Sequence, residues 1–281
     1  MVVSEPGTEY RGSRFDWNGF VKQVTLDGRH SFCVPESLTP GKGTGGCGLC
    51  GEFGIDEALG YEEAPIGGYF TKIGVGLLQK TGAGPYEFSG QYSVVPALSR
   101  VGRTGDSAEF MVCAPDCGGY AYEYRKDISL RENHLIISYF LKNVGTRAIR
   151  TTEYCHNFMG IDGLKVNGEY SLKLPFPAPI SMEAVVGEFR ESNGVITWPD
   201  TVMQRDFYCI IPDCRSNDTY SWELYNSRAG AGVRAAGDFQ VYRFALWGFR
   251  HVISPETFIR LELEPGQSKT WARDYEFYEQ R

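Results

Sequence analysis

The sequence predicts an all-β chain that folds as a large antiparallel β-sandwich, and three observations support this prediction. The 281 residues include 34 Gly, 17 Tyr, 17 Phe and 5 Trp, a composition typical of half-buried strands joined by tight turns. Apolar and polar residues alternate along many segments, whereas helical periodicity is hard to find. Candidate strands recur about every ten residues, the spacing expected of a sandwich or a barrel.

The candidate strands follow one another along most of the chain. Residues 120–130 show the pattern clearly, because the even positions are mostly large and apolar and the odd positions are small or polar. Residues 135–141 form a β-rich run, the segment 143–146 turns the chain back, and residues 148–158 supply the partner strand. Further runs of the same kind lie at residues 19–26, 69–78, 87–95, 109–113, 207–211, 220–225 and 240–248.

The C-terminal part alternates as well. Residues 259–263 place three apolar side chains on one face, and the Pro-Gly pair at 265–266 suits the centre of a type II turn. In the strand that follows, Trp271, Tyr275 and Phe277 share one side and are expected in the core.

The chain shows no internal boundary. Two irregular stretches are expected, a long Gly- and Pro-rich loop at residues 35–51 and a shorter one at residues 175–179. Neither resembles an interdomain linker, and no internal repeat is found. Residues 1–281 are therefore predicted to form a single domain.

Charge and hydropathy exclude two classes of partner. Lys and Arg total 28 and Asp and Glu total 35, so the net charge of −7 argues against a nucleic-acid partner. The longest apolar runs, at residues 135–137 and 244–249, are far shorter than the roughly 20 residues that span a bilayer. The N-terminus lacks the pattern of a signal peptide, which predicts a cytoplasmic protein; an exported protein trimmed of its leader is the alternative.

The eight cysteines do not form a strong motif. The only CxxC pair is Cys47 and Cys50, and a glycine-rich segment rather than a helix follows it. A zinc site would need Cys113 and Cys117 as a second pair, at a loose spacing. The cysteines are expected to be reduced or bridged, with no metal and no cofactor. One glycosylation sequon lies at residues 217–219.

Four histidines limit the available chemistry. His30 and His134 follow turns and are expected in solvent, whereas His156 lies inside a sheet-forming run and is either a core residue or a site residue. His251 is close in sequence to the carboxylate of Glu256. No nucleotide-binding glycine loop, nucleophile elbow or HExxH motif is present, so acid–base chemistry remains, and the aromatic surplus suits a sugar.

Three segments resemble galactose mutarotase-like (aldose 1-epimerase-like) proteins. Residues 139–162 contain a strand, an Asn-x-Gly turn, a second strand and then His156 beside Asn157 and an aromatic residue. Residues 254–277 contain a Pro-Gly turn before a final aromatic strand, and residues 10–19 are similar to the opening segment of the superfamily. The resemblance covers nearly the whole chain.

The resemblance implies a β-supersandwich fold and an enzyme that interconverts sugar anomers in a cleft. It implies that His156 protonates the ring oxygen of the sugar while Glu256 takes the proton of the anomeric hydroxyl. The family has an additional, earlier histidine, but this chain has none between His30 and His134. Lys72, Gln79 and Arg103 are candidates to replace that contact.

The ligand expected from the resemblance is a sugar or a sugar-derived small molecule. Tyr154, Phe158 and Trp247 are expected to line its cleft. The residues expected to contact it are Arg14, Asp16, Glu52, Lys72, Asn157, Trp247 and His251.

Two other functions remain open at this stage. The missing histidine is compatible with a carbohydrate-binding protein without catalysis. A glycosidase or lyase on the same fold would use two carboxylates, such as Glu52 and Glu256, as acid and base.

Overall fold

The computed structural model describes residues 1–176, 178–212, 214 and 220–280, so the sequon at 217–219 lies outside the described residues. Strands make up nearly all of the regular structure, and the only helical element described is a short 3-10 turn, η1 (Ile161–Gly163). Among these residues, no helix has the length and apolar character needed to cross a membrane.

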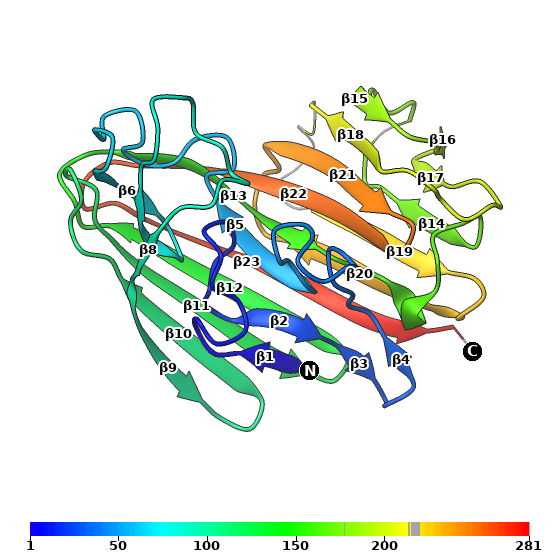
Figure 1. The fold of residues 1–281 in the computed structure, drawn as a ribbon. Coiled ribbons are helices and arrows are strands. Elements are labelled where there is room, and N and C mark those ends of the chain that lie inside the picture. Colours follow the sequence, from blue (N-terminus) through cyan, green and yellow to red (C-terminus); the bar gives the residue numbers. More distant parts are fainter. Residues whose placement is uncertain (177, 213, 215–219, 281) are drawn as a thin grey trace.

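Two large antiparallel sheets form a sandwich, as the sequence predicts (Figure 1). The eight-stranded sheet has the order β1 (Val2–Ser4), β2 (Phe20–Gln23), β5 (Leu49–Phe53), β13 (Ile149–Asn157), β22 (Val252–Leu263), β21 (Arg243–Phe249), β18 (Phe207–Ile211) and β15 (Glu183–Val186). The ten-stranded sheet has the order β16 (Arg190–Ser192), β17 (Val195–Thr197), β14 (Tyr170–Lys173), β19 (Tyr220–Asn226), β20 (Ala231–Gly237), β23 (Ser268–Glu279), β12 (His134–Asn143), β11 (Tyr122–Arg131), β10 (Ser107–Cys113) and β9 (Leu98–Arg103).

Two small sheets complete the fold. One pairs β3 (Thr25–Leu26) with β4 (His30–Ser31), and the other contains β6 (Tyr69–Lys72), β7 (Gly76–Gln79) and β8 (Val94–Pro96). Figure 1 shows the N-terminal segment and the connections around β6 and β8 beside the eight-stranded sheet, next to β5 and β13.

The core between the two large sheets follows from strand alternation. Along β11 the even positions Tyr122, Tyr124, Lys126 and Ile128 are buried, as the sequence pattern predicts. The expectation for β23 is also confirmed, because Trp271, Tyr275 and Phe277 are buried in it. The indole of Trp271 stacks on the ring of Tyr139 with centroids 5.0 Å apart.

A charged pair lies inside this core. Arg273 Nη1 is 2.8 Å from Glu153 Oε2, and the two side chains are 1% and 0% exposed. The Trp271 indole also donates a hydrogen bond to Glu153 Oε2. Burial raises the pKa of the Glu153 carboxyl, and the neighbouring Arg273 opposes that shift. Glu153 therefore depends on Arg273 to remain charged between the sheets.

The pleat of β13 decides which side chains face away from the core. Glu153 points toward the ten-stranded sheet, so Tyr154 and His156 point to the opposite face. Tyr154 pairs with Phe258 of β22, and farther along the chain Met159 pairs with Ile253. The same antiparallel register at both places sets His156 directly opposite Glu256.

The expected loop at residues 35–51 is too long, because β5 begins at Leu49 inside it. This strand pairs with β13 and sets Cys50 opposite His156 and Glu52 opposite Tyr154. The sequence hides β5 because all five of its residues are buried, so no alternation is visible, and because it contains a glycine.

Two other expected strands differ in extent. Residues 69–78 form the hairpin β6–β7 instead of one strand, and residues 87–95 contribute only the start of β8. The hairpin turns at Gly74, whose φ of +81° favours glycine. A Cβ at this position would lie 2.6 Å from Asp16 Oδ1, so the turn also needs glycine for space.

We expect Arg273→Met to lower the free energy of unfolding by about 3–5 kcal/mol, because the change leaves the buried carboxylate of Glu153 without its counter-charge. Arg260→Met is a matched control, since Arg260 and Glu262 form an exposed ion pair on β22. That change is expected to cost less than about 1 kcal/mol. Urea denaturation measures both variants, and an equal loss in the two would contradict this assignment. The loss in Arg273→Met is expected to shrink at acid pH, where Glu153 is protonated.

Candidate functional site

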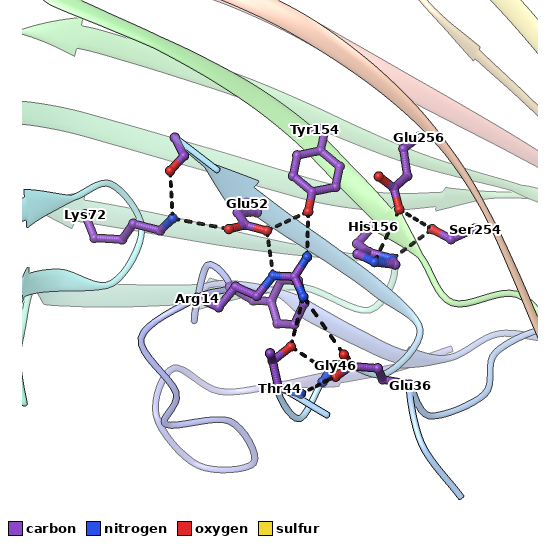
Figure 2. Close-up of polar contacts among 12 residues, drawn as sticks. Arg14, Glu36, Thr44, Gly46, Glu52, Lys72, Tyr154, His156, Ser254 and Glu256 are labelled. Atoms are coloured by element: carbon purple, nitrogen blue, oxygen red, sulfur yellow. Dashed lines mark hydrogen bonds and ion pairs between the residues drawn. The ribbon is translucent and has the colours of Figure 1, made fainter. Parts of the chain in front are cut away.

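Polar side chains gather on the face of the eight-stranded sheet that is turned away from the core. They come from the adjacent strands β5, β13 and β22 and from the segment before β2. Figure 2 shows two groups, one around Glu256 and one around Glu52, with Tyr154 and His156 next to each other along β13.

Ser254 bridges His156 and Glu256 by two hydrogen bonds, and the bridged side chains also approach each other directly. His156 Nε2 lies 3.2 Å from Glu256 Oε1. The Ser254 hydroxyl lies 2.8 Å from His156 Nδ1 and 3.0 Å from Glu256 Oε1 (Figure 2). Both ring nitrogens of His156 therefore contact side-chain groups that exchange protons.

Aromatic rings enclose the imidazole of His156. It stacks on the ring of Phe158, with the two ring centroids 4.0 Å apart. The rings of Phe15 and Trp247 meet it in edge-to-face arrangements, with centroid distances of 6.0 and 5.4 Å. The side chains of His156 and Glu256 are each only 6% exposed. The pair is therefore shielded from bulk water in this conformation.

This burial changes the protonation of both groups. Burial raises the pKa of Glu256 to about 8, although Arg14 and the hydrogen bond from Ser254 act in the opposite direction. Burial, with a smaller effect of the Arg14 charge, lowers the pKa of His156 well below its usual range. Near neutral pH, these directions favour a protonated Glu256 beside a neutral imidazole.

The second group is centred on the carboxylate of Glu52. Arg14 Nε donates to Glu52 Oε2 at 2.9 Å, and the Tyr154 hydroxyl donates to the same oxygen at 2.6 Å. Lys72 Nζ donates to Glu52 Oε1 at 3.3 Å. Since the Glu52 side chain is 0% exposed, its charge is balanced inside the protein by two cations.

Arg14 connects this group to a pocket at the surface. Its guanidinium donates to the Tyr154 hydroxyl and to Thr44 Oγ1 (Figure 2). The ring of Phe88 lies over the guanidinium at 4.5 Å. A pocket of about 270 Å³ reaches Arg14 from the surface, and Tyr10, Thr44, Phe88 and Tyr92 are among the residues that line it.

The structure brings together six of the residues expected at the site and adds three others. His156, Glu256, Arg14, Glu52 and Lys72 belong to the two groups, and Trp247 packs on His156. Sequence reasoning did not assign a role to Ser254, Thr44 or Tyr86. Ser254 could have been found, because it lies two residues before Glu256 on the same face of one strand. Tyr86 accepts a hydrogen bond from Lys72, but nothing in its sequence context indicates this contact.

Three expected contact residues lie elsewhere. Asp16 is buried and accepts hydrogen bonds from Tyr124 and Asn18. Asn157 points into the core, where it accepts from Tyr275 and donates to the carbonyl of Pro255. His251 is buried and bonds the carbonyl of Pro35 through Nε2. The structure does not bring these three side chains to the His156–Glu256 pair.

The candidates for the missing histidine contact are also separated. Arg103 lies on the surface with Glu5 at 3.0 Å, and Gln79 donates to the carbonyl of Gly67. Only Lys72 lies in the site.

The two expectations for the solvated histidines are met only in part. His30 contacts Asp162 Oδ2 at 2.8 Å, and His134 contacts Asp274 Oδ1 at 2.8 Å.

In the part of the chain that the structure describes, no group of three or more His, Cys, Asp or Glu side chains is arranged to hold a metal ion.

Comparison with known proteins identifies the fold. No family model matches the chain, and no curated protein matches it in sequence. A solved structure from Synechocystis has a TM-score of 0.53 at 11% identity and covers 99% of this chain and 100% of its own.

Two further structures carry descriptive names. A putative aldose 1-epimerase from Escherichia coli has a TM-score of 0.51 at 11% identity and covers 82% of this chain and 84% of its own. A galactose mutarotase related enzyme from Lactobacillus acidophilus has a TM-score of 0.52 at 11% identity, with 88% and 87% covered. This chain therefore has the galactose mutarotase-like fold that the sequence resemblance implies.

The raised pKa of Glu256 makes a prediction about stability. The pKa of Glu in an unfolded chain is about 4.3, which is lower than the pKa of Glu256 in the native state. The native state therefore holds the Glu256 proton more tightly than the unfolded state does. The free energy of unfolding of the wild type should fall, relative to that of Glu256→Gln, as the pH rises from about 4.5 to about 8.

Urea denaturation across this pH range measures the difference. Glu262→Gln, which changes an exposed carboxyl on the same strand, is the matched control and should show no such trend. A Glu256→Gln curve that stays parallel to the wild-type curve would show that Glu256 titrates normally.

Proposed function

We propose that this chain binds a sugar or a sugar-derived small molecule and interconverts its anomers by acid–base catalysis at His156 and Glu256. The observation that carries the proposal is their direct contact, with Nε2 and Oε1 3.2 Å apart, on a face where Trp247 provides an apolar wall. The similarity in fold to proteins named as aldose 1-epimerases supports the same chemistry.

The side-by-side arrangement suits the reaction. Anomer exchange opens the sugar ring when one proton leaves the anomeric hydroxyl and another reaches the ring oxygen. Both oxygens are bonded to the same carbon, so one acid and one base on neighbouring strands can serve them together. A sugar bound at the pair would place these two oxygens against His156 Nε2 and the carboxyl of Glu256.

The protonation of the pair bears on the role of each residue. The resemblance implies that His156 is the acid and Glu256 the base. A protonated Glu256 beside a neutral His156 supports the opposite division near neutral pH, with Glu256 donating to the ring oxygen and His156 Nε2 accepting from the hydroxyl. The return reaction uses the two groups in reverse.

The other functions left open by the sequence differ in support. The burial of the pair favours sugar binding without catalysis. The side chains of His156 and Glu256 are each only 6% exposed, and both are already hydrogen-bonded to Ser254. A hydrolase that uses Glu52 and Glu256 is less well supported, because Glu52 is fully buried and bonded to Arg14, Tyr154 and Lys72.

We expect His156→Ala and Glu256→Gln each to slow anomer exchange by about 10²–10⁴-fold, the usual contribution of one general acid or base. NMR line exchange or polarimetry on freshly dissolved aldoses measures the rate. His134→Ala is the control, because His134 is a half-buried histidine that contacts Asp274 on the other large sheet. Full activity in either site variant would disprove the assignment, and saturable sugar binding without any exchange would select the binding protein.

The pH dependence distinguishes the two divisions of roles. If protonated Glu256 is the acid, the turnover rate should fall as the pH rises through about 8, where this carboxyl loses its proton. If Glu256 is the base, the rate should rise over the same interval. Turnover measured at saturating aldose across this interval decides between them.

A further inference from the structure

Ser254 is completely buried and occupies a position that the proposed function leaves unexplained. Its hydroxyl contacts His156 Nδ1 at 2.8 Å and Glu256 Oε1 at 3.0 Å. It also accepts a hydrogen bond from the backbone N–H of Asn157 at 3.0 Å. Asn157 therefore fixes one lone pair of the hydroxyl and leaves one O–H and one lone pair for the other two contacts.

The chain from Glu256 through Ser254 to His156 can then be bonded in two directions when Glu256 is protonated and His156 is neutral. In the first arrangement Nδ1–H donates to Ser254, and Ser254 donates to Glu256 Oε1. In the second arrangement the Glu256 proton points to Ser254, Ser254 donates to Nδ1, and Nε2 carries the ring proton. The two arrangements contain the same number of protons and differ in the tautomer of His156.

We propose that Ser254 is a proton relay between Glu256 and Nδ1 of His156, which lets the pair move a proton from the anomeric hydroxyl to the ring oxygen without charging the imidazole. This inference rests on the proposed function. It adds a third residue, which acts through His156 and Glu256 and does not itself touch the sugar.

The step balances in protons and electrons. Glu256 gives its proton to the ring oxygen, and His156 Nε2 takes the proton of the anomeric hydroxyl. The bond between the anomeric carbon and the ring oxygen breaks, and the hydroxyl oxygen becomes the carbonyl oxygen. Nδ1 passes its proton to Ser254, and Ser254 passes its own to Glu256. Glu256 is again protonated, and His156 has only changed tautomer.

The surroundings favour such a neutral relay. An imidazolium at this position would be buried among Phe15, Phe158 and Trp247, and the positive charge of Arg14 would repel it.

Ser254 is unsuited to act as a nucleophile, although it contacts a histidine that contacts an acid. Its oxygen is 0% exposed and already bonded to Asn157.

The test compares Ser254→Ala with Ser254→Thr, which keeps a hydroxyl, in the full-length chain. Anomer exchange on glucose and galactose gives the turnover rate and KM. Nitrogen-15 NMR of labelled histidine gives the tautomer of His156 independently of activity. Thermal unfolding reports whether each variant folds.

For Ser254→Ala we expect a loss in turnover of about 10²-fold with little change in KM, and partial recovery in Ser254→Thr. We also expect the His156 signals, averaged between two tautomers in the wild type, to become those of one tautomer in Ser254→Ala. Unchanged turnover, or tautomer signals that do not change, would overturn the relay.

Failure of the proposed function looks different. If the wild type does not accelerate exchange of any aldose, the enzyme assignment fails. The histidine signals still decide whether Ser254 connects Glu256 to Nδ1. If Ser254→Thr does not fold, the tautomer of His156 measured in Ser254→Ala is sufficient to test the relay.

Discussion

The antiparallel register between β13 and β22 is the constraint on which the site depends. It makes His156 and Glu256 cross-strand neighbours, with Nε2 and Oε1 3.2 Å apart. A slip of β13 by one residue would turn His156 into the core and bring Glu153 and Cys155 to the outer face, away from the pairing with Glu256. The buried contacts of Glu153 with Arg273 and Trp271 oppose such a slip, so the core holds the site in register.

The environment of the pair then determines its chemistry. Aromatic rings exclude water from His156, and the cost of charging buried groups favours a neutral imidazole and a protonated carboxyl. Arg14 carries a positive charge that acts on both groups, and Glu52, which forms a direct ion pair with Arg14, acts on Glu256 in the opposite direction. Acid and base are thus prepared by burial, with the charged network of Arg14, Glu52 and Lys72 beside them.

Much of this could be predicted from the sequence. Alternation located β11, β13, β23 and the C-terminal part of β22, and the resemblance indicated His156 and Glu256 as partners. What the sequence could not show is that they touch side by side, because this depends on a register set by long-range pairing. The strand β5 was missed because it is buried on both faces, and with it the pairing of Glu52 and Tyr154. Asp16 and Asn157 lie in motif-like segments, but both bond to core residues, Asp16 from the segment before β2 and Asn157 from the core side of β13.

The most direct measurement is two-dimensional NMR exchange spectroscopy on a panel of aldoses and aldose derivatives with the wild-type chain. Acid–base catalysis at the pair should give cross-peaks between the α and β anomeric protons of at least one sugar, under conditions where the sugar alone shows none. A sugar that binds to the protein at the His156–Glu256 pair but shows no added exchange, with no other member of the panel accelerated, would disprove catalysis at this pair.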